Sequence, residues 1–246
     1  PEILRKAQRI KFNPKIKIEN LDPELLQKVD NEIISNMVFN LGLVEMISYW
    51  KSACPPIIRI KTGGVDEEQI SWWIDLLERG LGEFFYQNKI DFTKEKLVTI
   101  ESHSDKKFKK HSGVLDGKIL ILNGGGRDSA VTLELSKELK KDLGILMLNP
   151  TQASFDVAKE SHISKRIVVK REIDENLLNL NKKGYLNGHT PFSAYLAFLS
   201  VICSFIENYE LVFSSNERSS NEENTEFLGR KINHQYTKSF EFEQKF

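Results

Sequence analysis

Cysteine is scarce in this chain, and long apolar runs are absent. The two cysteines, Cys54 and Cys203, form neither a CxxC pair nor a metal-ligand spacing, so we expect two free thiols in a reducing compartment. No apolar run reaches the roughly 20 residues that a membrane-spanning helix needs, and no signal peptide is visible at the start. We therefore expect a cytoplasmic protein with no membrane partner. The first residue is Pro1 rather than Met, which predicts a fragment of a longer chain.

An excess of charge of either sign is also lacking. The 246 residues include 35 Lys and Arg against 35 Asp and Glu, so the chain has no general attraction to nucleic acid or to an anionic membrane. We expect no nucleic-acid partner, and nothing in the composition indicates an oligomeric state. The local basic run at residues 106–110 is interpreted as a solvated linker. With 40% hydrophobic residues, the chain can bury one large core or two small ones.

The first part of the chain predicts a small α+β domain over residues 1–113. Its predicted helix at 67–88 is strongly amphipathic, and Gly80 and Gly82 indicate close packing there. A polar segment at 102–113 marks the domain boundary. Strands are expected at 9–12 and 15–19, with Asn13-Pro14 as the turn between them, and at 57–60 and 97–100; helices are expected at 23–50, with a break near Gly42, and at 67–88.

The second part, residues 114–246, alternates apolar strands with helices. This alternation predicts an α/β fold, a parallel sheet with helices on both faces. In the first of these helices, Val131, Leu135 and Leu139 share one side. Strands are expected at 118–122, 143–148, 166–170 and 211–213, and helices at 128–141, 152–162, 173–182 and 191–207.

A glycine-rich segment, NGGGRDS at residues 123–129, lies directly between a buried strand and a helix. In parallel α/β folds, ligands bind beyond the carboxyl ends of the strands. The successive glycines Gly124, Gly125 and Gly126 let the backbone approach an anion, and the helix N-terminus adds partial positive charge. The segment therefore predicts a phosphate-binding loop. The alternative is a glycine-rich turn capped by Asp128 or Ser129.

The loop differs from the two most familiar phosphate motifs, because both GxxxxGK[ST] and GxGxxG are absent. Its Gly-Gly-x-Asp-Ser spacing resembles the ATP-pyrophosphatase loop, SGGxDS, with Gly124 in place of the serine. Enzymes with that loop cleave ATP between the α- and β-phosphates. The resemblance therefore implies adenylation of a carbonyl or carboxyl oxygen, and Arg127 is expected to replace part of the attraction that the missing hydroxyl would supply.

Other polar segments hold further candidates for a site. Thr190 is the expected N-cap of the long helix, with Pro191 as its first residue. His189 beside it can act as an acid or base near neutral pH. The segment SSNERSSNEEN (residues 214–224) begins at a strand's carboxyl end and suggests contacts to a polar ligand or to Mg²⁺. A capping or solvated surface loop is the alternative for these segments and for NHQY at residues 233–236.

Together these segments resemble one family. GEFFY (82–86), the loop at 124–129, LNGHTPFSA (186–194), SNE (215–217) and NHQYTKSFEF (233–242) are similar to segments of the UDP-N-acetylmuramoyl-L-alanyl-L-glutamate epimerases of peptidoglycan synthesis. The resemblance covers residues 70–246, and GHTPFSA and NHQYxKSxEFE are its specific part. It implies an adenine-nucleotide alpha-hydrolase-like domain over residues 114–246, incomplete at its C-terminal end.

The resemblance implies that the terminal L-glutamate of UDP-N-acetylmuramoyl-L-Ala-L-Glu is inverted to D-glutamate. The α-proton beside an ionised carboxylate is very weakly acidic, because its removal puts two negative charges on neighbouring atoms. Adenylation of the carboxylate with ATP cancels its charge. A base can then remove the proton, its return from the opposite face inverts the centre, and hydrolysis of the acyl-adenylate releases AMP.

The same resemblance implies roles for particular residues. Arg127 is expected to stabilise the departing charge, and Mg²⁺ is expected at Asp128, bridging the phosphates. His189 and His234 are the candidates for the base, and Lys238 for binding a substrate carboxylate or phosphate. The phosphates of ATP are assigned to Gly124, Gly125, Gly126, Asp128 and Ser129, and the substrate to Asn187, Thr190, Asn216, Glu217 and Arg218.

Two other functions fit the loop. The first is another ATP-pyrophosphatase-type enzyme, such as a nitrogen-transferring ligase or amidotransferase. Sulfur-transferring enzymes of that type often use cysteine pairs, which this chain lacks. The second is a non-catalytic nucleotide-binding module, which predicts ATP binding without turnover.

Overall fold

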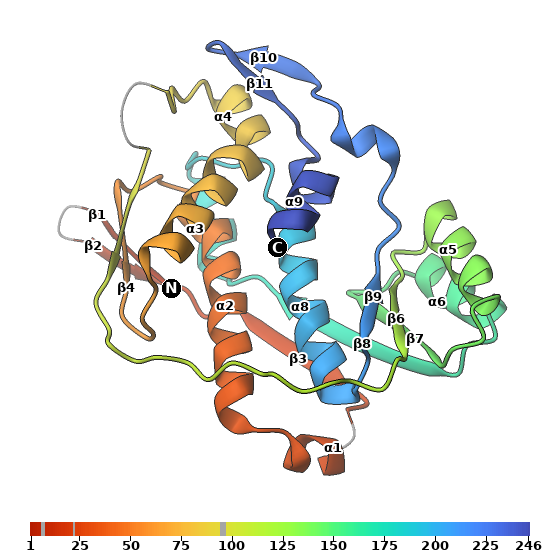
Figure 1. The fold of residues 1–246 in the computed structure, drawn as a ribbon. Helices are drawn as coiled ribbons and strands as arrows, with labels where there is room; N and C mark the ends of the chain where they lie inside the picture. Colours follow the sequence, from red (N-terminus) through yellow and green to blue (C-terminus); the bar gives the residue numbers. More distant parts are fainter. Residues whose placement is uncertain (6–7, 22, 94–96) are drawn as a thin grey trace.

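Short strands and helices alternate along the computed structural model, which describes residues 1–5, 8–21, 23–93 and 97–246 (Figure 1). The strands are β1 (Glu2–Arg5), β2 (Gln8–Lys11), β3 (Lys15–Glu19), β4 (Ile57–Ile60), β5 (Thr99–Ser102), β6 (Ile119–Leu122), β7 (Leu143–Leu148), β8 (Lys165–Glu172), β9 (Leu211–Phe213), β10 (Thr225–Phe227) and β11 (Arg230–Ile232). The helices are α1 (Pro23–Lys28), α2 (Asn31–Trp50), α3 (Glu67–Gly80), α4 (Gly82–Asn88), α5 (Arg127–Lys137), α6 (Gln152–Glu160), α7 (Glu175–Lys182), α8 (Phe192–Glu207) and α9 (Phe240–Lys245), with 3₁₀ turns η1 (Arg218–Asn221) and η2 (Tyr236–Lys238).

A five-stranded sheet organises the fold, in the order β3-β8-β7-β6-β9. Strands β8, β7, β6 and β9 run parallel, as the alternation of apolar strands and helices predicted. Strand β3 joins the edge of β8 in the antiparallel direction, with Ile18 opposite Val169. The sheet is therefore mixed rather than purely parallel, because a strand from near the N-terminus completes its edge.

Helices cover both faces of this sheet, which confirms the predicted layering. On one face, Leu133 of α5 and Ala158 of α6 share a buried cluster with Ile121 of β6. On the other face, Leu199 of α8 lies in a larger cluster with Leu120 of β6. Neighbouring residues of β6 thus enter opposite cores, because side chains alternate along a strand. This explains why the strand reads as a continuous apolar run.

The larger core draws on residues from both sides of the predicted boundary at residue 113. Ile47 of α2 and Leu77 of α3 lie in the same cluster as Leu146 of β7 and Leu199 of α8. Two smaller sheets lie in the first part of the chain, an antiparallel pair of β1 with β2 and a parallel pair of β4 with β5. The division into domains over residues 1–113 and 114–246 stays a prediction.

The strands predicted on either side of Asn13-Pro14 are present, but they do not pair with each other. Strand β2 pairs with β1, and β3 pairs with β8. The helix predicted at 23–50 breaks at Val29 and Asp30 and runs through Gly42 without a break. Asp30 causes this start, because its side chain accepts a hydrogen bond from the backbone N–H of Glu32 at 2.9 Å.

The helix predicted at 67–88 is two helices, α3 and α4, which meet at Leu81. Close packing at the two glycines is confirmed, because an added Cβ would lie 3.0 Å from Pro191 at Gly80 and 3.1 Å from Ile232 at Gly82. The apolar stripe of this region is core as predicted, with Trp73, Leu77 and Phe84 among the buried residues of the larger cluster.

The shared side of Val131, Leu135 and Leu139 faces solvent rather than the sheet. These side chains are 57%, 59% and 50% exposed, whereas Leu133 on the other side of α5 is fully buried. The polar segment between β5 and β6 passes along α2 (Figure 1), where Lys109 forms an ion pair with Asp30. The lysine run interpreted as a solvated linker is thus held at this position.

Both cysteines are free thiols, as expected, and Cys203 lies in the core. Within the part of the chain that the structure describes, no helix combines the length and the apolar character needed to cross a membrane.

Candidate functional site

A cavity of about 550 Å³ opens at the carboxyl ends of β6 and β9. From β6 the chain passes through α5 to β7 on one side, whereas α8 leads to β9 on the other side, so the connections diverge between β6 and β9. Such a divergence is the usual ligand site of an open parallel sheet. The cavity is lined by Leu122, Gly124, Ser129, Thr132, Ser193, Leu196, Ala197, Ser200, Val201, Val212, Phe213, Ser214, Ser215, Asn216, Thr237, Lys238, Ser239, Phe242, Glu243 and Phe246.

Asn123 builds the glycine loop at one wall of the cavity. Its buried side chain donates to the carbonyl of Ser154 at 2.9 Å and accepts from the backbone N–H of Gly125 at 2.8 Å. Gly125 has a φ of +83°, and an added Cβ would lie 2.6 Å from the backbone nitrogen of Ser154. At Gly124 and Gly126 an added Cβ would meet nothing within 4 Å. The loop is therefore pressed against α6 at its middle glycine and open at the outer two.

The N-terminus of α5 follows this loop. Gly126 occupies the N-cap position, and neither Asp128 nor Ser129 caps the helix. Ser129 is buried and accepts from the backbone N–H of Gly124 at 3.2 Å. Arg127 and Asp128 are exposed at the first turn and do not line the cavity. The free amides of an uncapped helix N-terminus attract anions.

The segment after β9 forms a second wall of the cavity. Thr132 of α5 and Ser215 share a hydroxyl hydrogen bond of 2.8 Å across this wall, and Asn216 accepts from the Ser214 hydroxyl at 3.1 Å. Glu217 and Arg218 are exposed and are not among the lining residues. Of the candidates in this segment, the structure thus brings Asn216 to the cavity and leaves the other two outside it.

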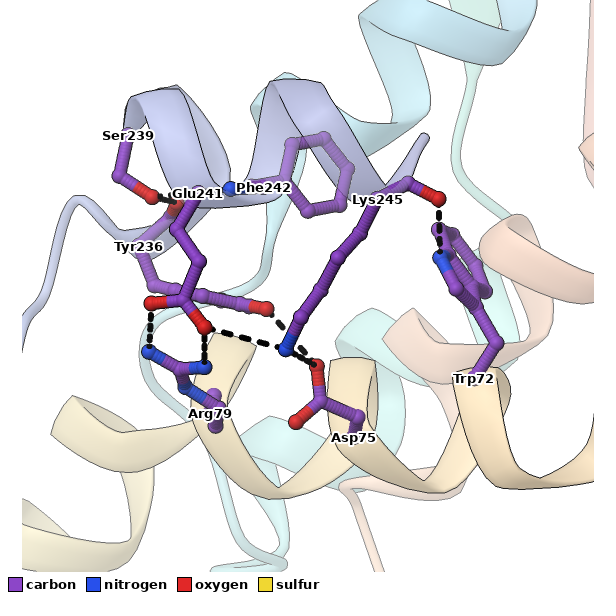
Figure 2. A network of polar contacts seen from close by, with 8 residues as sticks. All are labelled: Trp72, Asp75, Arg79, Tyr236, Ser239, Glu241, Phe242 and Lys245. Carbon is purple, nitrogen blue, oxygen red and sulfur yellow. Dashed lines mark hydrogen bonds and ion pairs between the residues drawn. The ribbon is translucent and has the colours of Figure 1, made fainter.

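The C-terminal segment places Lys238 in the cavity lining. Figure 2 shows how this segment is clamped to α3. The carboxylate of Glu241 binds the guanidinium of Arg79 through both oxygens, and Arg79 also lies 4.1 Å above the centre of the Tyr236 ring. The Tyr236 hydroxyl donates to Asp75 at 2.8 Å. The hydrogen bond from Arg79 lowers the pKa of Glu241 to about 2, so this clamp is ionised at neutral pH.

The clamp continues along α9. Lys245 forms ion pairs of 3.1 Å with both Asp75 and Glu241, and its carbonyl accepts from the indole N–H of Trp72 at 2.9 Å. Ser239 caps α9 through the backbone N–H of Phe242. The Tyr236, Glu241 and Phe242 side chains of the NHQYxKSxEFE segment therefore anchor the chain beside the cavity, and they leave Lys238 free to face it.

A second polar cluster surrounds the segment Gly188-His189-Thr190 before α8. Thr190 does not cap this helix, because Pro191 holds the N-cap position and α8 begins at Phe192. The Thr190 hydroxyl instead accepts from the ammonium of Lys51 at 2.6 Å. Lys51 also donates to the carbonyl of Gly188, and it is only 6% exposed. The buried ammonium of Lys51 therefore holds the segment before α8 in place.

His189 lies opposite a carboxylate. Its Nδ1 is 3.2 Å from an oxygen of Glu83 on α4, and Gln87 donates to the other oxygen of Glu83 at 2.7 Å. Asn88 donates to the carbonyl of Asn187 at 3.0 Å. The GEFFY segment and the LNGHTPFSA segment, distant in sequence, are thus in direct contact. Asn187 itself is exposed, and its side chain accepts from the N–H of Gly188.

The three candidates for proton transfer and anion binding are electrostatic neighbours. Burial lowers the pKa of His189, Glu83 opposes this shift, and the charges of Lys51, His234 and Lys238 add to the lowering. His234 is exposed, and its Nδ1 pairs with the side-chain oxygen of Asn224. Lys238 lines the cavity, whereas His189 and His234 are not among its lining residues.

The model of one protein family, the MurL N-terminal domain, matches residues 4–246. This chain belongs to that family. The family resemblance that the GHTPFSA and NHQYxKSxEFE segments predicted is confirmed. No solved structure matches this MurL chain.

Curated relatives of the MurL chain bear the name UDP-N-acetyl-alpha-D-muramoyl-L-alanyl-L-glutamate epimerase. The protein from Micromonospora sp. is 29% identical over 203 residues, which are 82% of this chain and 45% of that protein. The protein from Xanthomonas oryzae pv. oryzae is 27% identical over 208 residues, 84% of this chain and 45% of that protein. A relative from Salinispora tropica is 29% identical over 204 residues. This chain spans less than half the length of these relatives.

Sequence reasoning did not single out Lys51 or Glu83 in this MurL chain. Lys51 is a lysine among 35 basic residues, and only the fold brings it to the segment before α8. Glu83 lies inside the GEFFY segment, which is one of the segments that carried the family resemblance. It is the polar residue between Gly82 and the apolar Phe84. Its place in a segment of the family resemblance was the available signal.

Proposed function

We propose that this chain forms the part of a UDP-N-acetylmuramoyl-L-alanyl-L-glutamate epimerase that binds ATP and the glutamate end of the substrate. The names of the MurL relatives support this role in peptidoglycan precursor synthesis. The observation that carries the proposal is the cavity between β6 and β9. It gathers the glycine loop, Asn216 and Lys238, which come from three segments of the family resemblance, at one edge of the sheet.

ATP with Mg²⁺ fits the groups that are present. The loop amides, the uncapped N-terminus of α5 and Lys238 are suited to phosphate oxygens. Asp128 offers one carboxylate at the same helix end, and Mg²⁺ is usually held by one or two carboxylates together with substrate phosphates. Across the described ranges, no group of three or more His, Cys, Asp or Glu side chains could hold a metal ion. The phosphates would therefore supply most of the other ligands.

The chain's residues would then assist proton removal beside an activated carboxylate. Bound ATP supplies adenylation, which cancels the carboxylate charge and makes its carbonyl an electron sink. Lys238 would bind a carboxylate or phosphate of the substrate, and Arg127 would stabilise the departing negative charge. His189 or His234 would remove the α-proton, a contribution of about 10²–10⁴-fold for a positioned general base. Protonation of the opposite face would invert the centre, and hydrolysis of the acyl-adenylate by water would release AMP and leave the terminal D-glutamate.

The deciding experiment uses a protein that contains this chain at the length of its relatives. UDP-N-acetylmuramoyl-L-Ala-L-Glu is incubated with ATP and Mg²⁺, and the glutamate is resolved by chiral chromatography after acid hydrolysis. We expect D-glutamate with release of AMP and pyrophosphate and no added nucleophile. Only L-glutamate would sink the proposal. Turnover that requires an added amine would indicate a ligase, and ATP binding without turnover would indicate a non-catalytic module.

The loop assignment has its own test. We expect Asp128→Asn to reduce the rate of pyrophosphate release at least about tenfold, because the metal ion would lose its carboxylate ligand at the N-terminus of α5. Asp156→Asn, an exposed change on α6 outside the cavity lining, is the matched control and keeps the rate. An undiminished rate of pyrophosphate release in Asp128→Asn would contradict the assignment of this loop to the ATP site.

A further inference from the structure

The cluster around His189 contains two ionised groups on opposite sides of one short segment. Glu83 approaches the ring from α4, at 3.2 Å from Nδ1. Lys51, at the C-terminal end of α2, approaches the backbone of the same segment and donates to Gly188, to Thr190 and, at 3.3 Å, to the carbonyl of His189 itself. Neither group lines the cavity. His189 does not line it either, so Glu83 and Lys51 are contacts of a candidate base that lies outside the cavity lining.

We propose that Glu83 and Lys51 are positioning residues that make His189, rather than His234, a neutral proton-transfer base with its Nε2 free for the substrate. The word base rests on the proposed function, whereas the positioning is a property of the fold. His189 and His234 are both candidates from the sequence, and the contacts of Glu83 and Lys51 distinguish them.

Glu83 sets the tautomer of His189. The contact is an ion pair when the ring is charged, and the negative charge of a carboxylate beside Nδ1 favours the tautomer that carries its proton on that nitrogen. A neutral ring with its proton on Nδ1 leaves Nε2 as an unprotonated acceptor, which is the form that a base requires. Gln87, one helical turn further along α4, donates a hydrogen bond of 2.7 Å to the other oxygen of Glu83. This hydrogen bond fixes the orientation of the carboxylate.

Lys51 sets the path of the backbone that carries His189. An ammonium has three N–H donors, and here they face the Gly188 carbonyl, the His189 carbonyl and the Thr190 hydroxyl. Gly188 has a φ of +143°, so the segment turns where only glycine is at ease. The carbonyls of Gly188 and His189 thus face Lys51, whereas the His189 ring faces Glu83 on α4.

Charge supports the neutral form of His189. The charged or titratable groups that face it are Glu83 from α4, Lys51 from the end of α2, and His234 and Lys238 from the C-terminal segment. Burial lowers the pKa of His189 most, Lys51, His234 and Lys238 lower it further, and the carboxylate of Glu83 opposes them. His234 is exposed and its Nδ1 pairs with an amide oxygen of Asn224, so among the contacts of the described residues it lacks the burial and the carboxylate neighbour that His189 has.

The test measures His189 directly by NMR, with ¹⁵N-labelled histidine in the full chain. In the wild type we expect the ring in the tautomer protonated on Nδ1. Lys51→Met is expected to raise the pKa of His189 by about half a unit to one unit, because a nearby positive charge is lost, and Lys51→Arg is expected to restore it. Glu83→Gln is expected to lower the pKa and to mix the two tautomers. His162, on the far side of the sheet at the end of α6, is the internal control and is expected to titrate alike in all variants.

A second readout follows the α-proton. In D₂O with ATP and Mg²⁺, His189→Gln is expected to slow deuterium incorporation into the substrate glutamate by about 10²–10⁴-fold, and His234→Gln by less than about tenfold. The acid limb of kcat/KM in Lys51→Met is expected to move upward with the NMR titration. Unchanged titration and tautomer in Lys51→Met and Glu83→Gln would overturn the positioning, whatever the activity. Normal exchange in His189→Gln would overturn the choice of base, whereas absence of exchange in the wild type would count against the proposed function and leave the NMR result to decide the positioning.

Discussion

At the scale of single residues, the three glycines of the loop between β6 and α5 are not equivalent. Gly125 combines a positive φ with an approach so close that an added Cβ would lie 2.6 Å from the backbone of Ser154. Gly124 and Gly126 have ordinary φ angles and open space around them. The fold itself therefore requires only the middle glycine. The outer two are free to serve a ligand, which the run of three identical letters could not reveal.

Substitutions at Gly125 and at Gly124 test this difference. Gly125→Ala is expected to lower the free energy of unfolding by about 1–3 kcal/mol, because the backbone is strained and α6 must shift. Gly124→Ser, which introduces the serine of the SGGxDS pattern, is expected to change it by less than about 0.5 kcal/mol. Urea denaturation of both variants measures the difference. Equal losses would contradict the arrangement of the loop against α6.

Lys51 gives a second prediction at this scale, on the pH dependence of stability. Burial, followed by the charge of Arg171, lowers the pKa of Lys51 from 10.5 to about 8. Below pH 8 the ammonium is charged in both states and its burial costs stability in full. Between about pH 8 and 10.5 the folded chain releases a proton that the unfolded chain retains, so stability rises with pH.

The wild type is therefore expected to gain about 1–3 kcal/mol relative to Lys51→Met between pH 7.5 and 10.5. Guanidinium denaturation of both proteins at each pH measures this, and the comparison cancels the titration of other groups. Lys159→Met, at an exposed lysine of α6, is the control and is expected to show no such gain. A constant difference between wild type and Lys51→Met would mean that the ammonium is not buried in solution.

At the scale of elements, the contact of α9 with α3 explains why the C-terminal segment carries so many charged and aromatic residues. Arg79 and Glu241 form a bidentate pair whose side chains are 40% and 50% exposed, so solvent weakens the pair. Its importance is geometric, because it fixes the turn from which Lys238 reaches the cavity.

Glu241→Gln is expected to lower the free energy of unfolding by about 1 kcal/mol at neutral pH, since an exposed pair contributes little more. It is also expected to raise the KM for ATP several-fold with little change in kcat, because Lys238 loses its fixed position. The pKa of Glu241 is lowered to about 2, so the stability difference is expected to be complete above about pH 4.5 and to vanish as the pH falls toward 2.

The matched control for the clamp is Glu134→Gln, which removes an ion pair of similar exposure with Lys137 on α5. It is expected to have the same small effect on stability and none on KM. A KM effect of equal size in both variants would show that the clamp does not position Lys238.

Helix α5 provides a further prediction about which of its faces is core. Leu133→Ala is expected to cost about 2–5 kcal/mol, because it opens a cavity between the helix and the sheet. Leu135→Ala, whose side chain is 59% exposed, is expected to cost less than about 0.5 kcal/mol. Thermal or urea denaturation distinguishes the two, and a reversed order would restore the side of Val131, Leu135 and Leu139 as the buried one.

At the scale of the whole molecule, the chain on either side of residue 113 meets in one hydrophobic cluster. The buried pair of Glu45 on α2 and Arg171 on β8 joins the same two regions through hydrogen bonds of 2.7 and 3.0 Å. Strand β3 adds a ladder to β8. These contacts favour unfolding in a single step, because disruption of either region exposes apolar surface of the other.

All three tryptophans lie before residue 113, but Trp72 and Trp73 pack against Phe198 of α8 in the second region. A variant that keeps Trp50 as its one tryptophan therefore confines the fluorescence probe to α2 of the first region. We expect the urea midpoint seen by fluorescence to coincide with the midpoint of amide exchange in β7, which lies in the second region. Coincident transitions would show one cooperative unit, whereas two separate transitions would show that residues 1–113 form a domain of their own.

The local pattern predicted the parallel strands, their helices and the edge at which the site lies. The glycine loop, Asn216 and Lys238 meet at that edge because parallel strands bring their carboxyl ends together. The pattern did not predict the side of α5 that is buried, the break at Leu81 or the cap of α8. Each of these depends on contacts with distant residues, such as Pro191 against Gly80 and Lys51 with Thr190.

The sequence by itself determined the family, the layers of the sheet and the position of the glycine loop between β6 and α5, because periodicity and motif spacing are properties of neighbouring residues. Tertiary structure alone decided that β3 completes the sheet, that Glu83 faces His189 and that Lys51 lies beneath the segment before α8. These pairings join residues far apart in the chain, and no local pattern specifies which distant partner a charged side chain will meet. The free energy of burying those charges together is a property of the fold.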